Sequence, residues 1–158
     1  MGGGLHKSQS LFEQVVDLEN LLLAWGEFRR GKRSKKDVQG FERNLEDNLF
    51  CLHQDLEQGI WQPAAYEGFY VTDPKLRHIH KACVRDRLVH QAVFRVLYPI
   101  FDRQFIFDSY SCRMEKGTHR AVKRLENFCR KLSYNYRRNI FVLKCDIRKF
   151  FGSMAIVF

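Results

Sequence analysis

One carboxylate near the end of the chain stands out by its surroundings. In the segment "IFVLKCDIRKFF", an apolar run typical of a buried strand ends at Asp146. A carboxylate at the end of a strand offers a hard oxygen ligand in a fixed place, which is what Mg²⁺ requires. For this residue taken alone, a strand-end cap is the commoner role. The metal hypothesis therefore depends on the rest of the chain.

Positive charge is the second chemical feature. The chain of 158 residues has 27 lysines and arginines against 18 aspartates and glutamates, which gives a net charge of +9. Nucleic acid is the usual partner of such an excess. A basic protein whose charge serves only solubility is the alternative, and charge alone does not separate the two.

The cysteines and histidines do not predict a zinc site. The five cysteines are scattered and form no Cys-x-x-Cys pair, which favours free thiols in a reducing, cytoplasmic compartment. His78 and His80 lie two residues apart, but no thiol or carboxylate with ligand-like spacing accompanies them. No apolar run has the length of a membrane span, and residues 1–9 are expected to be a flexible start.

Two helices are expected before the first strands. Ser10 and Glu13 have the spacing of a capping box at the start of the first helix. The basic segment "FRRGKRSKK" separates the two helices, either as a solvated loop or as a phosphate-binding patch. Asp37 is expected to cap the second helix, which ends at Gly59. The apolar stripes are Leu11, Val15, Leu18, Leu22 and Trp25, then Phe41, Leu45, Leu49, Leu52 and Leu56.

The middle of the chain alternates as a β-hairpin does. "AYEGFYV" and "LRHIHKA" flank "TDPK", in which Pro74 presets a turn. Arg77, Ile79 and Lys81 share one face of the second strand. That face is either a wet surface or a grip on phosphate oxygens, and this segment alone favours the wet surface.

Two further helices and a strand are expected after the hairpin. An apolar stripe from Val84 defines the first of these helices, which Pro99 should end or kink near Tyr98. After the loop "DSYSCRMEKGTH", Thr118 is expected to cap the next helix, which "YNYRR" ends before the strand "IFVLK". This last helix should have Ala121, Leu125, Phe128 and Leu132 inside, and Arg120, Lys123, Arg124, Arg130 and Lys131 mostly outside.

Together these segments resemble the N-terminal part of a bacterial reverse transcriptase of the group II intron, retron or diversity-generating retroelement type. "LENLLLAW" and "FERNLEDNLFCLHQDLEQGIWQP" resemble the helical entry to the fingers. "KLRHIHKACVRDRLVHQAVFRVLYPIFDRQFIFDSYSCR" resembles the first fingers blocks, "KGTHRAV" the next block and "LKCDIRKFF" the first palm motif. Each block alone is weak, and their order and spacing over residues 11–153 carry the resemblance.

The resemblance implies a role for the palm residues in two-metal nucleotidyl transfer. It makes Asp146 the catalytic, metal-binding aspartate, and it makes the carbonyl of Ile147 a second contact to Mg²⁺. Phe151 resembles the aromatic residue that packs beneath the sugar of the incoming nucleotide and excludes a 2′-hydroxyl.

The resemblance also implies contacts to the dNTP and to nucleic acid. Arg77 best matches the fingers cation that contacts the triphosphate, with Lys75 beside it. Arg113 matches an arginine placed near template and nucleotide. Arg87 is a nucleic-acid candidate, although its neighbour Asp86 offers an internal ion pair instead. The remaining nucleic-acid-binding candidates are Lys81, Lys116, Arg120, Lys123, Arg124 and Lys131.

The sequence departs from the family pattern after Phe151. "GSMAIVF" fits the family poorly, and these 158 residues contain neither the Tyr-x-Asp-Asp motif nor a thumb. One aspartate cannot hold two metal ions, so this chain alone is expected to be inactive. Either the reading frame is cut or shifted, or a second chain supplies the rest of the palm.

The sequence therefore predicts an α+β fold. A mostly helical fingers region with a hairpin is expected over residues 10–138, and the first strand of an incomplete palm sheet over residues 139–158. The predicted function is template and dNTP binding by the fingers of an RNA-directed DNA polymerase. Its partners would be RNA template, DNA primer and dNTP, with Mg²⁺ in the complete enzyme and no membrane. A non-catalytic nucleic-acid-binding fragment is the alternative.

Overall fold

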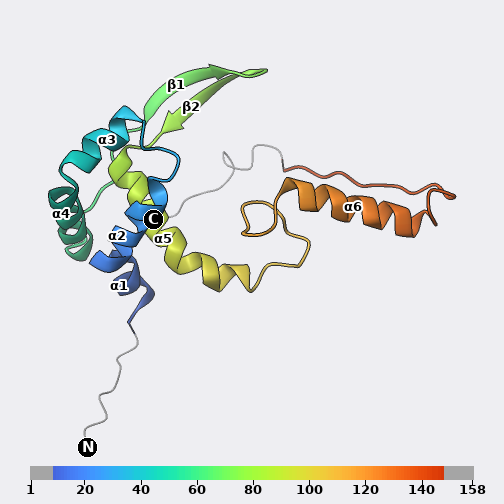
Figure 1. Cartoon of the computed structure of the whole chain (residues 1–158), viewed down its shortest axis with the longest axis horizontal. Coiled ribbons are helices and arrows are strands. Elements are labelled where there is room, and N and C mark those ends of the chain that lie inside the picture. Colours follow the sequence, from blue (N-terminus) through green and yellow to red (C-terminus); the bar gives the residue numbers. More distant parts are fainter. Residues whose placement is uncertain (1–8, 148–158) are drawn as a thin grey trace, which may run out of the picture. The chain divides into compact units, whose positions relative to one another are not determined.

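The computed structural model describes residues 9–147, which form an α+β protein with six helices and one two-stranded sheet in that range (Figure 1). The chain divides into unit 1, Met1–Phe105, and unit 2, Ile106–Phe158. Among residues 9–147, no helix combines the length and the apolar composition that a bilayer span requires.

Two short helices open unit 1. The predicted capping box is confirmed, because the Ser10 hydroxyl accepts from the Glu13 amide at 3.1 Å and the Glu13 carboxylate accepts from the Ser10 amide at 2.8 Å. The expected single helix is instead α1 (Leu11–Val16) and α2 (Leu18–Phe28). Asp17, with φ −53° and ψ 132°, interrupts it. Because of this break, the residues of the predicted apolar stripe do not all lie on one side. Trp25 is buried, while Leu11 and Leu22 are exposed.

The second expected helix is also divided, into α3 (Lys36–Arg43) and α4 (Leu45–Glu57). The prediction that Asp37 caps it is wrong, since Lys35 is the N-cap residue and Asp37 lies in the first turn. Asn44, with φ −121° and ψ 45°, separates the two helices. Gly59 follows α4 with a φ of +67°, a conformation that glycine adopts without strain.

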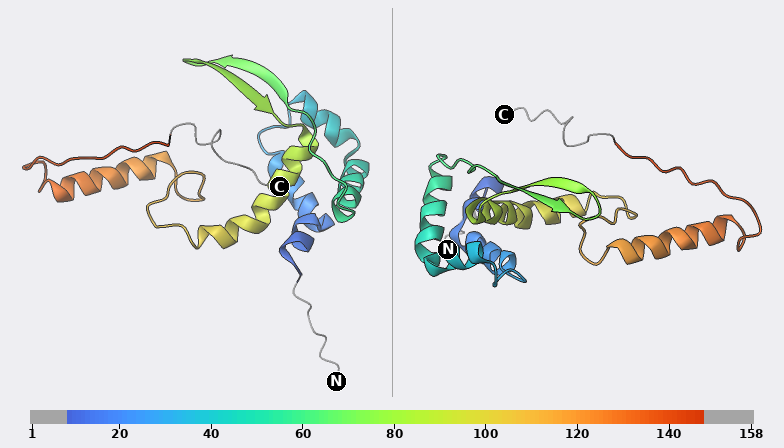
Figure 2. Two further views of the ribbon diagram at one scale, coloured as in Figure 1. Left: turned by 180° about the vertical axis from the view of Figure 1, so that it is seen from behind. Right: turned by 90° about the horizontal axis from the view of Figure 1, so that it is seen from above.

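The predicted hairpin is confirmed. Strands β1 (Glu67–Thr72) and β2 (Leu76–Lys81) pair antiparallel, with Tyr70 opposite His78 and Val71 opposite Arg77. Apart from Lys81, every residue of both strands is exposed, and the hairpin extends away from the helices of unit 1 (Figures 1 and 2).

The last element of unit 1 is the longest helix in the described range, α5 (Val84–Asp102). Of the two effects predicted for Pro99, an end of the helix near Tyr98 does not occur, because the helix continues to Asp102; a kink stays a prediction. The proline lies in the last turn, where its fixed φ suits a helix and only one intrahelical hydrogen bond is lost.

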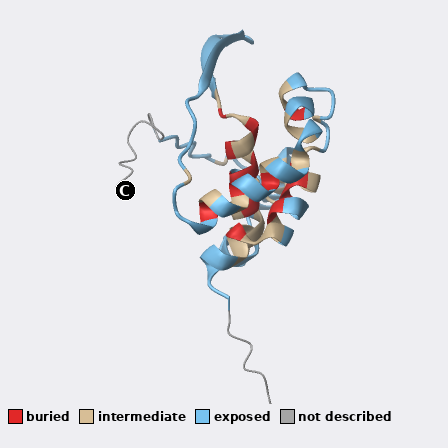
Figure 3. Cartoon of the chain, turned by 90° about the vertical axis from the view of Figure 1, so that its left-hand side faces the viewer, coloured by how far each residue is buried: buried red, intermediate tan, exposed pale blue. Residues whose placement is uncertain are grey.

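The hydrophobic core lies where α1, α2, α3 and α4 meet α5 (Figure 3). The helix pair α2 and α5 forms the most extensive helix–helix contact within unit 1. Fully enclosed side chains from three helices, Leu21, Leu52 and Leu88, contribute to it. Trp25 stacks obliquely on Phe41 with ring centroids 5.1 Å apart. Burying such side chains stabilises the unit by about 1.5–3 kcal/mol each.

Unit 2 has a loop over residues 106–117 and helix α6 (Thr118–Leu132). The prediction that Thr118 caps this helix is wrong, since Gly117 is the N-cap residue and no side chain caps the helix. The predicted break at "YNYRR" is confirmed by positive φ angles at Tyr134, Asn135 and Tyr136. No residue of α6 is buried, and the predicted inner residue Leu125 is 51% exposed.

The predicted strand before Asp146 does not form among the described residues. Residues 140–147 have no regular structure, and Phe141 is 98% exposed. A strand requires a hydrogen-bonding neighbour, and no second strand lies beside this segment in the described part of the chain. Within residues 9–147, the hairpin therefore supplies all of the β structure.

Candidate nucleic-acid interface

Two predicted nucleotide-binding cations occupy the hairpin. Lys75 lies in the turn, and Arg77 lies on β2. Both are exposed, and neither makes an ion pair or side-chain hydrogen bond within residues 9–147. Their charges are therefore available to an anionic ligand without competition from a carboxylate.

Lys81 and Arg87 have a different environment, because both contact Asp37 of α3. The Lys81 ammonium lies 2.8 Å and the Arg87 guanidinium 2.5 Å from the same Asp37 oxygen. Lys81 also lies 3.6 Å from Glu67, and Arg87 covers the ring of Phe28 at 5.2 Å. These contacts join α3, the end of β2 and α5.

The charges of this cluster shift its titration. The hydrogen bond from Lys81, assisted by Arg87 and opposed by partial burial, lowers the pKa of Asp37 from 3.8 to about 2. The same hydrogen bond raises the pKa of Lys81 above 10.5. Asp37 is ionised and Lys81 is protonated near neutral pH, so a phosphate would compete with Asp37 for its contacts to Lys81 and Arg87.

The alternative ion pair around Asp86 does not occur. Arg85 contacts Asp55 of α4, and Arg87 contacts Asp37. Asp86 is 2% exposed and instead accepts from the Ala64 amide at 2.9 Å. Adjacent residues on a helix do not face one another, which explains why these neighbours find distant partners.

Asp108 organises the cations of unit 2 in a similar way. Arg124 donates to both of its carboxylate oxygens, at 2.9 and 3.4 Å, and the Tyr110 hydroxyl donates at 3.1 Å. The hydrogen bond from Arg124 is the main reason that the pKa of Asp108 is lowered and that of Arg124 raised. Arg124 also lies 4.4 Å from the centre of the Phe128 ring.

Three other predicted cations hold the loop that precedes α6. Arg113 donates to the carbonyls of Ile106 and Ser109 at 3.0 and 3.3 Å. Lys116 donates to the Phe107 carbonyl and lies 3.8 Å from the centre of that ring, and Arg120 donates to the Glu115 carbonyl. These side chains therefore have a structural role in the loop.

Lys123 and Lys131 complete the predicted set in unit 2. Both are exposed on α6, and neither has a polar side-chain contact in the part of the chain that the structure describes. Of the predicted binding residues, the hairpin pair and these two lysines are thus the cations without internal partners in residues 9–147.

The predicted metal residues do not assemble a site within the described residues. Asp146 and Ile147 are exposed in the irregular segment, and residues 9–147 contain no group of three or more histidine, cysteine, aspartate or glutamate side chains that could hold a metal ion. Phe151 lies outside the described residues. The donor set for Mg²⁺ is therefore incomplete in this part of the chain.

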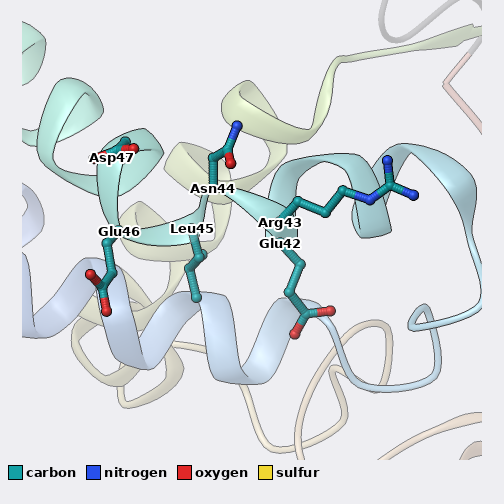
Figure 4. Close-up of a pocket in the computed structure, with 6 residues that line it drawn as sticks. All are labelled: Glu42, Arg43, Asn44, Leu45, Glu46 and Asp47. Atoms are coloured by element: carbon teal, nitrogen blue, oxygen red, sulfur yellow. The ribbon is translucent and has the colours of Figure 1, made fainter.

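A hollow at the junction of α3 and α4 also lacks the features of a site. Its lining residues are consecutive in sequence, and Figure 4 shows their side chains pointing in different directions rather than toward one centre. None of the predicted binding residues lines it; the residues are Glu42, Arg43, Asn44, Leu45, Glu46 and Asp47.

The carboxylates that organise the cations were not identified from the sequence. The sequence predicts a helix cap at Asp37 and no function at Asp108. Arg87 lies 50 residues from Asp37, and Arg124 lies 16 residues from Asp108. No local pattern indicates such pairings. The available signal is local: Asp37 directly follows the basic segment "FRRGKRSKK".

Comparison with known proteins gives one partial relationship. No protein-family model matches the chain. Protein YkfC of Escherichia coli (strain K12) is 30% identical over 84 residues, which cover 52% of this chain and 22% of that protein. The similarity thus spans about a fifth of the length of the curated relative.

Proposed function

We propose that this chain is the fingers part of an RNA-directed DNA polymerase and that it binds nucleic acid through its basic surfaces. The ordered blocks that resemble bacterial reverse transcriptases support the family assignment. The observation that carries the binding proposal is the exposed hairpin, where Lys75 and Arg77 have no carboxylate partner among residues 9–147. An arginine placed in this way can bind phosphate oxygens through paired hydrogen bonds.

The proposed chemistry belongs to a complete enzyme and not to this chain by itself. Mg²⁺ would bind through Asp146 and the Ile147 carbonyl only together with further carboxylates, since a two-metal centre needs more than one. The missing carboxylates would come from the rest of the palm, in the same or in a second chain. The dNTP would lie against the hairpin, near Arg77.

A non-catalytic nucleic-acid-binding fragment is the second candidate. The specific observation in its favour is that the described cations without partners lie on exposed elements, whereas Asp146 belongs to no group of three or more metal-ligating side chains in residues 9–147. Both candidates share the binding step, and they differ in whether a completed palm restores polymerisation.

The binding step is tested by measuring the affinity of the chain for single-stranded RNA over a salt series. Affinity should fall with salt with a log–log slope of about 0.7 per neutralised phosphate, and two unrelated RNA sequences should give the same slope. Binding that does not depend on salt would contradict the proposal.

The catalytic step is tested separately with RNA template, DNA primer, dNTPs and Mg²⁺. The chain alone should extend no primer, because one carboxylate cannot hold two metal ions. Extension by a pure sample would show that the chain contains more of the active site than proposed here.

A further inference from the structure

One face of the hairpin has a row of four aromatic and imidazole rings. Tyr70 lies directly opposite His78 in the register, and Gly68 lies opposite His80. Directly paired residues and residues two apart share one face of a sheet, so Tyr70, His78 and His80 point the same way. Tyr66, just before β1, lies at the end of this row. Arg77 and Phe69 belong to the opposite face.

The rings contact one another in sequence along this face. Tyr70 stacks on His78 with centroids 4.6 Å apart, and His78 meets the edge of His80 at 4.3 Å. His80 in turn meets Tyr66 edge-on at 6.3 Å. Despite these contacts the row is open to solvent, with Tyr66 60% and Tyr70 68% exposed.

Gly68 provides space for this row. A Cβ atom at this position would lie 2.8 Å from Nε2 of His78, closer than such atoms approach in proteins. The imidazole of His78 therefore lies over β1 at Gly68, the residue of that strand without a side chain. Replacing Gly68 with alanine would displace the His78 ring and leave the backbone free of a clash.

Neither the core nor a metal ion explains this surface. None of the four rings is buried. Within residues 9–147, no third metal-ligating side chain joins His78 and His80. Exposed tyrosine and histidine rings in a row, with cations at the hairpin turn and on its other face, are typical of proteins that bind unpaired bases and the phosphates between them.

We propose that the face formed by Tyr66, Tyr70, His78 and His80 stacks against unpaired bases of single-stranded nucleic acid. Lys75 in the hairpin turn would contact an adjoining phosphate, and the net charge of +9 favours this occupant over another basic protein such as a second copy of the chain. The inference rests on the proposed nucleic-acid binding and adds that the hairpin reads bases by their flat surfaces, independently of sequence.

The experiment compares two oligonucleotides of equal charge. One is a uridine oligomer of about twelve nucleotides, within the range of single-strand binding sites, and the other is an abasic ribose-phosphate chain of the same length. Phosphate contacts alone predict equal affinity. Stacking predicts that the chain binds the uridine oligomer about fivefold more tightly or better.

Hairpin variants locate the effect. Tyr70→Val and His78→Val should each remove most of the preference for the base-containing oligomer, while valine keeps the strand propensity. Gly68→Ala should reduce the preference by displacing His78. Phe69→Val, on the opposite face, is the matched control and should leave the preference unchanged. Nuclear Overhauser contacts between β1 and β2 verify that each hairpin still forms.

The outcomes separate the two proposals. Tight, salt-dependent binding with equal affinity for both oligomers would overturn the stacking role and leave the proposed nucleic-acid binding intact. The stacking role would also be overturned if the Tyr70 and His78 variants kept the preference for the uridine oligomer. It would be overturned as well if the Phe69 control lost that preference to the same extent as they do. Failure to bind either oligomer would overturn both proposals. Ring-dependent self-association seen by sedimentation would assign the face to a second copy instead.

Discussion

Unit 1 and unit 2 both contain amphipathic helices, but among the described residues only unit 1 buries their apolar side. In unit 1, α5 packs against α1, α2 and α3, and its residues Leu88 and Ala92 are completely buried. In unit 2, α6 has an apolar stripe of the same kind, and none of its residues is buried. Burial of a helix requires both an apolar stripe and a second element that packs against it. In the described residues, α6 has the stripe but no such element.

The two units also hold their cations differently. In unit 1, Asp37 joins cations from two other elements and so contributes to tertiary structure. In unit 2, Asp108 holds Arg124 beside exposed aromatic rings, and the contacts connect a loop to the helix that follows it. The same type of ion pair thus stabilises a folded core in one unit and a local surface in the other.

Truncating one apolar residue in each unit should give the largest contrast. Leu88→Ala should lower the free energy of unfolding by about 2–5 kcal/mol, because a cavity forms in an enclosed core. Leu125→Ala should change it by less than about 0.5 kcal/mol, because half of that residue is already exposed to solvent. Urea denaturation followed by circular dichroism measures both. A large loss in the Leu125 variant would reveal that α6 is covered by another element.

Removing the carboxylate of each cluster should give a smaller contrast. The pKa of Asp37 is depressed to about 2, so its stabilising contribution is complete above about pH 4 and is lost as the pH falls toward 2. The loss should be about 1–2 kcal/mol, since one third of the side chain is exposed and solvent screens the pair.

The matched variants are Asp37→Asn and Asp108→Asn. The first should flatten the dependence of unfolding on pH between 4 and 2, while the second should leave the unfolding of the helical core unchanged, because Asp108 lies in unit 2. An unchanged acid profile in the Asp37 variant would mean that the cluster does not stabilise unit 1.

Replacing the unpartnered cations tests whether the two units contribute equally to nucleic-acid binding. Lys123→Ala with Lys131→Ala should reduce the log–log salt slope for single-stranded RNA by about 1.4, the value for two phosphates, and Lys75→Ala with Arg77→Ala by a similar amount. Alanine preserves the α6 helix, which circular dichroism verifies. If replacing one of these pairs of cations leaves the salt slope unchanged, that pair does not contact phosphates and belongs to the solvated surface.

The smallest expected effect is that of removing the carboxylate of Asp146 on RNA affinity. Asp146→Asn should leave the affinity for RNA within about twofold of the wild type, because removing one exposed negative charge at physiological salt changes a screened interaction only slightly. The same titration measures it. A strong gain in affinity would place Asp146 against the phosphate backbone and argue against a role confined to metal binding.

Local sequence signals were sufficient where the structure depends on near neighbours. The capping box at Ser10 and Glu13, the hairpin around Pro74 and the break after α6 all follow from residues within one turn or one strand. The helix boundaries were less predictable. Asp17 and Asn44 divide helices whose apolar spacing continues across them, and Pro99 lies in a last turn that tolerates it.

The candidate site divides in the same way. The sequence by itself determined the positive charge, the hairpin that presents Lys75 and Arg77, and the alternation that places His78 and His80 on the face opposite Arg77, since each depends on period and composition. Only the tertiary structure decided which cations are balanced by carboxylates. Asp37 meets Arg87 across 50 residues, and the apolar stripe of α6 remains exposed because burial depends on a partner element that no stripe encodes.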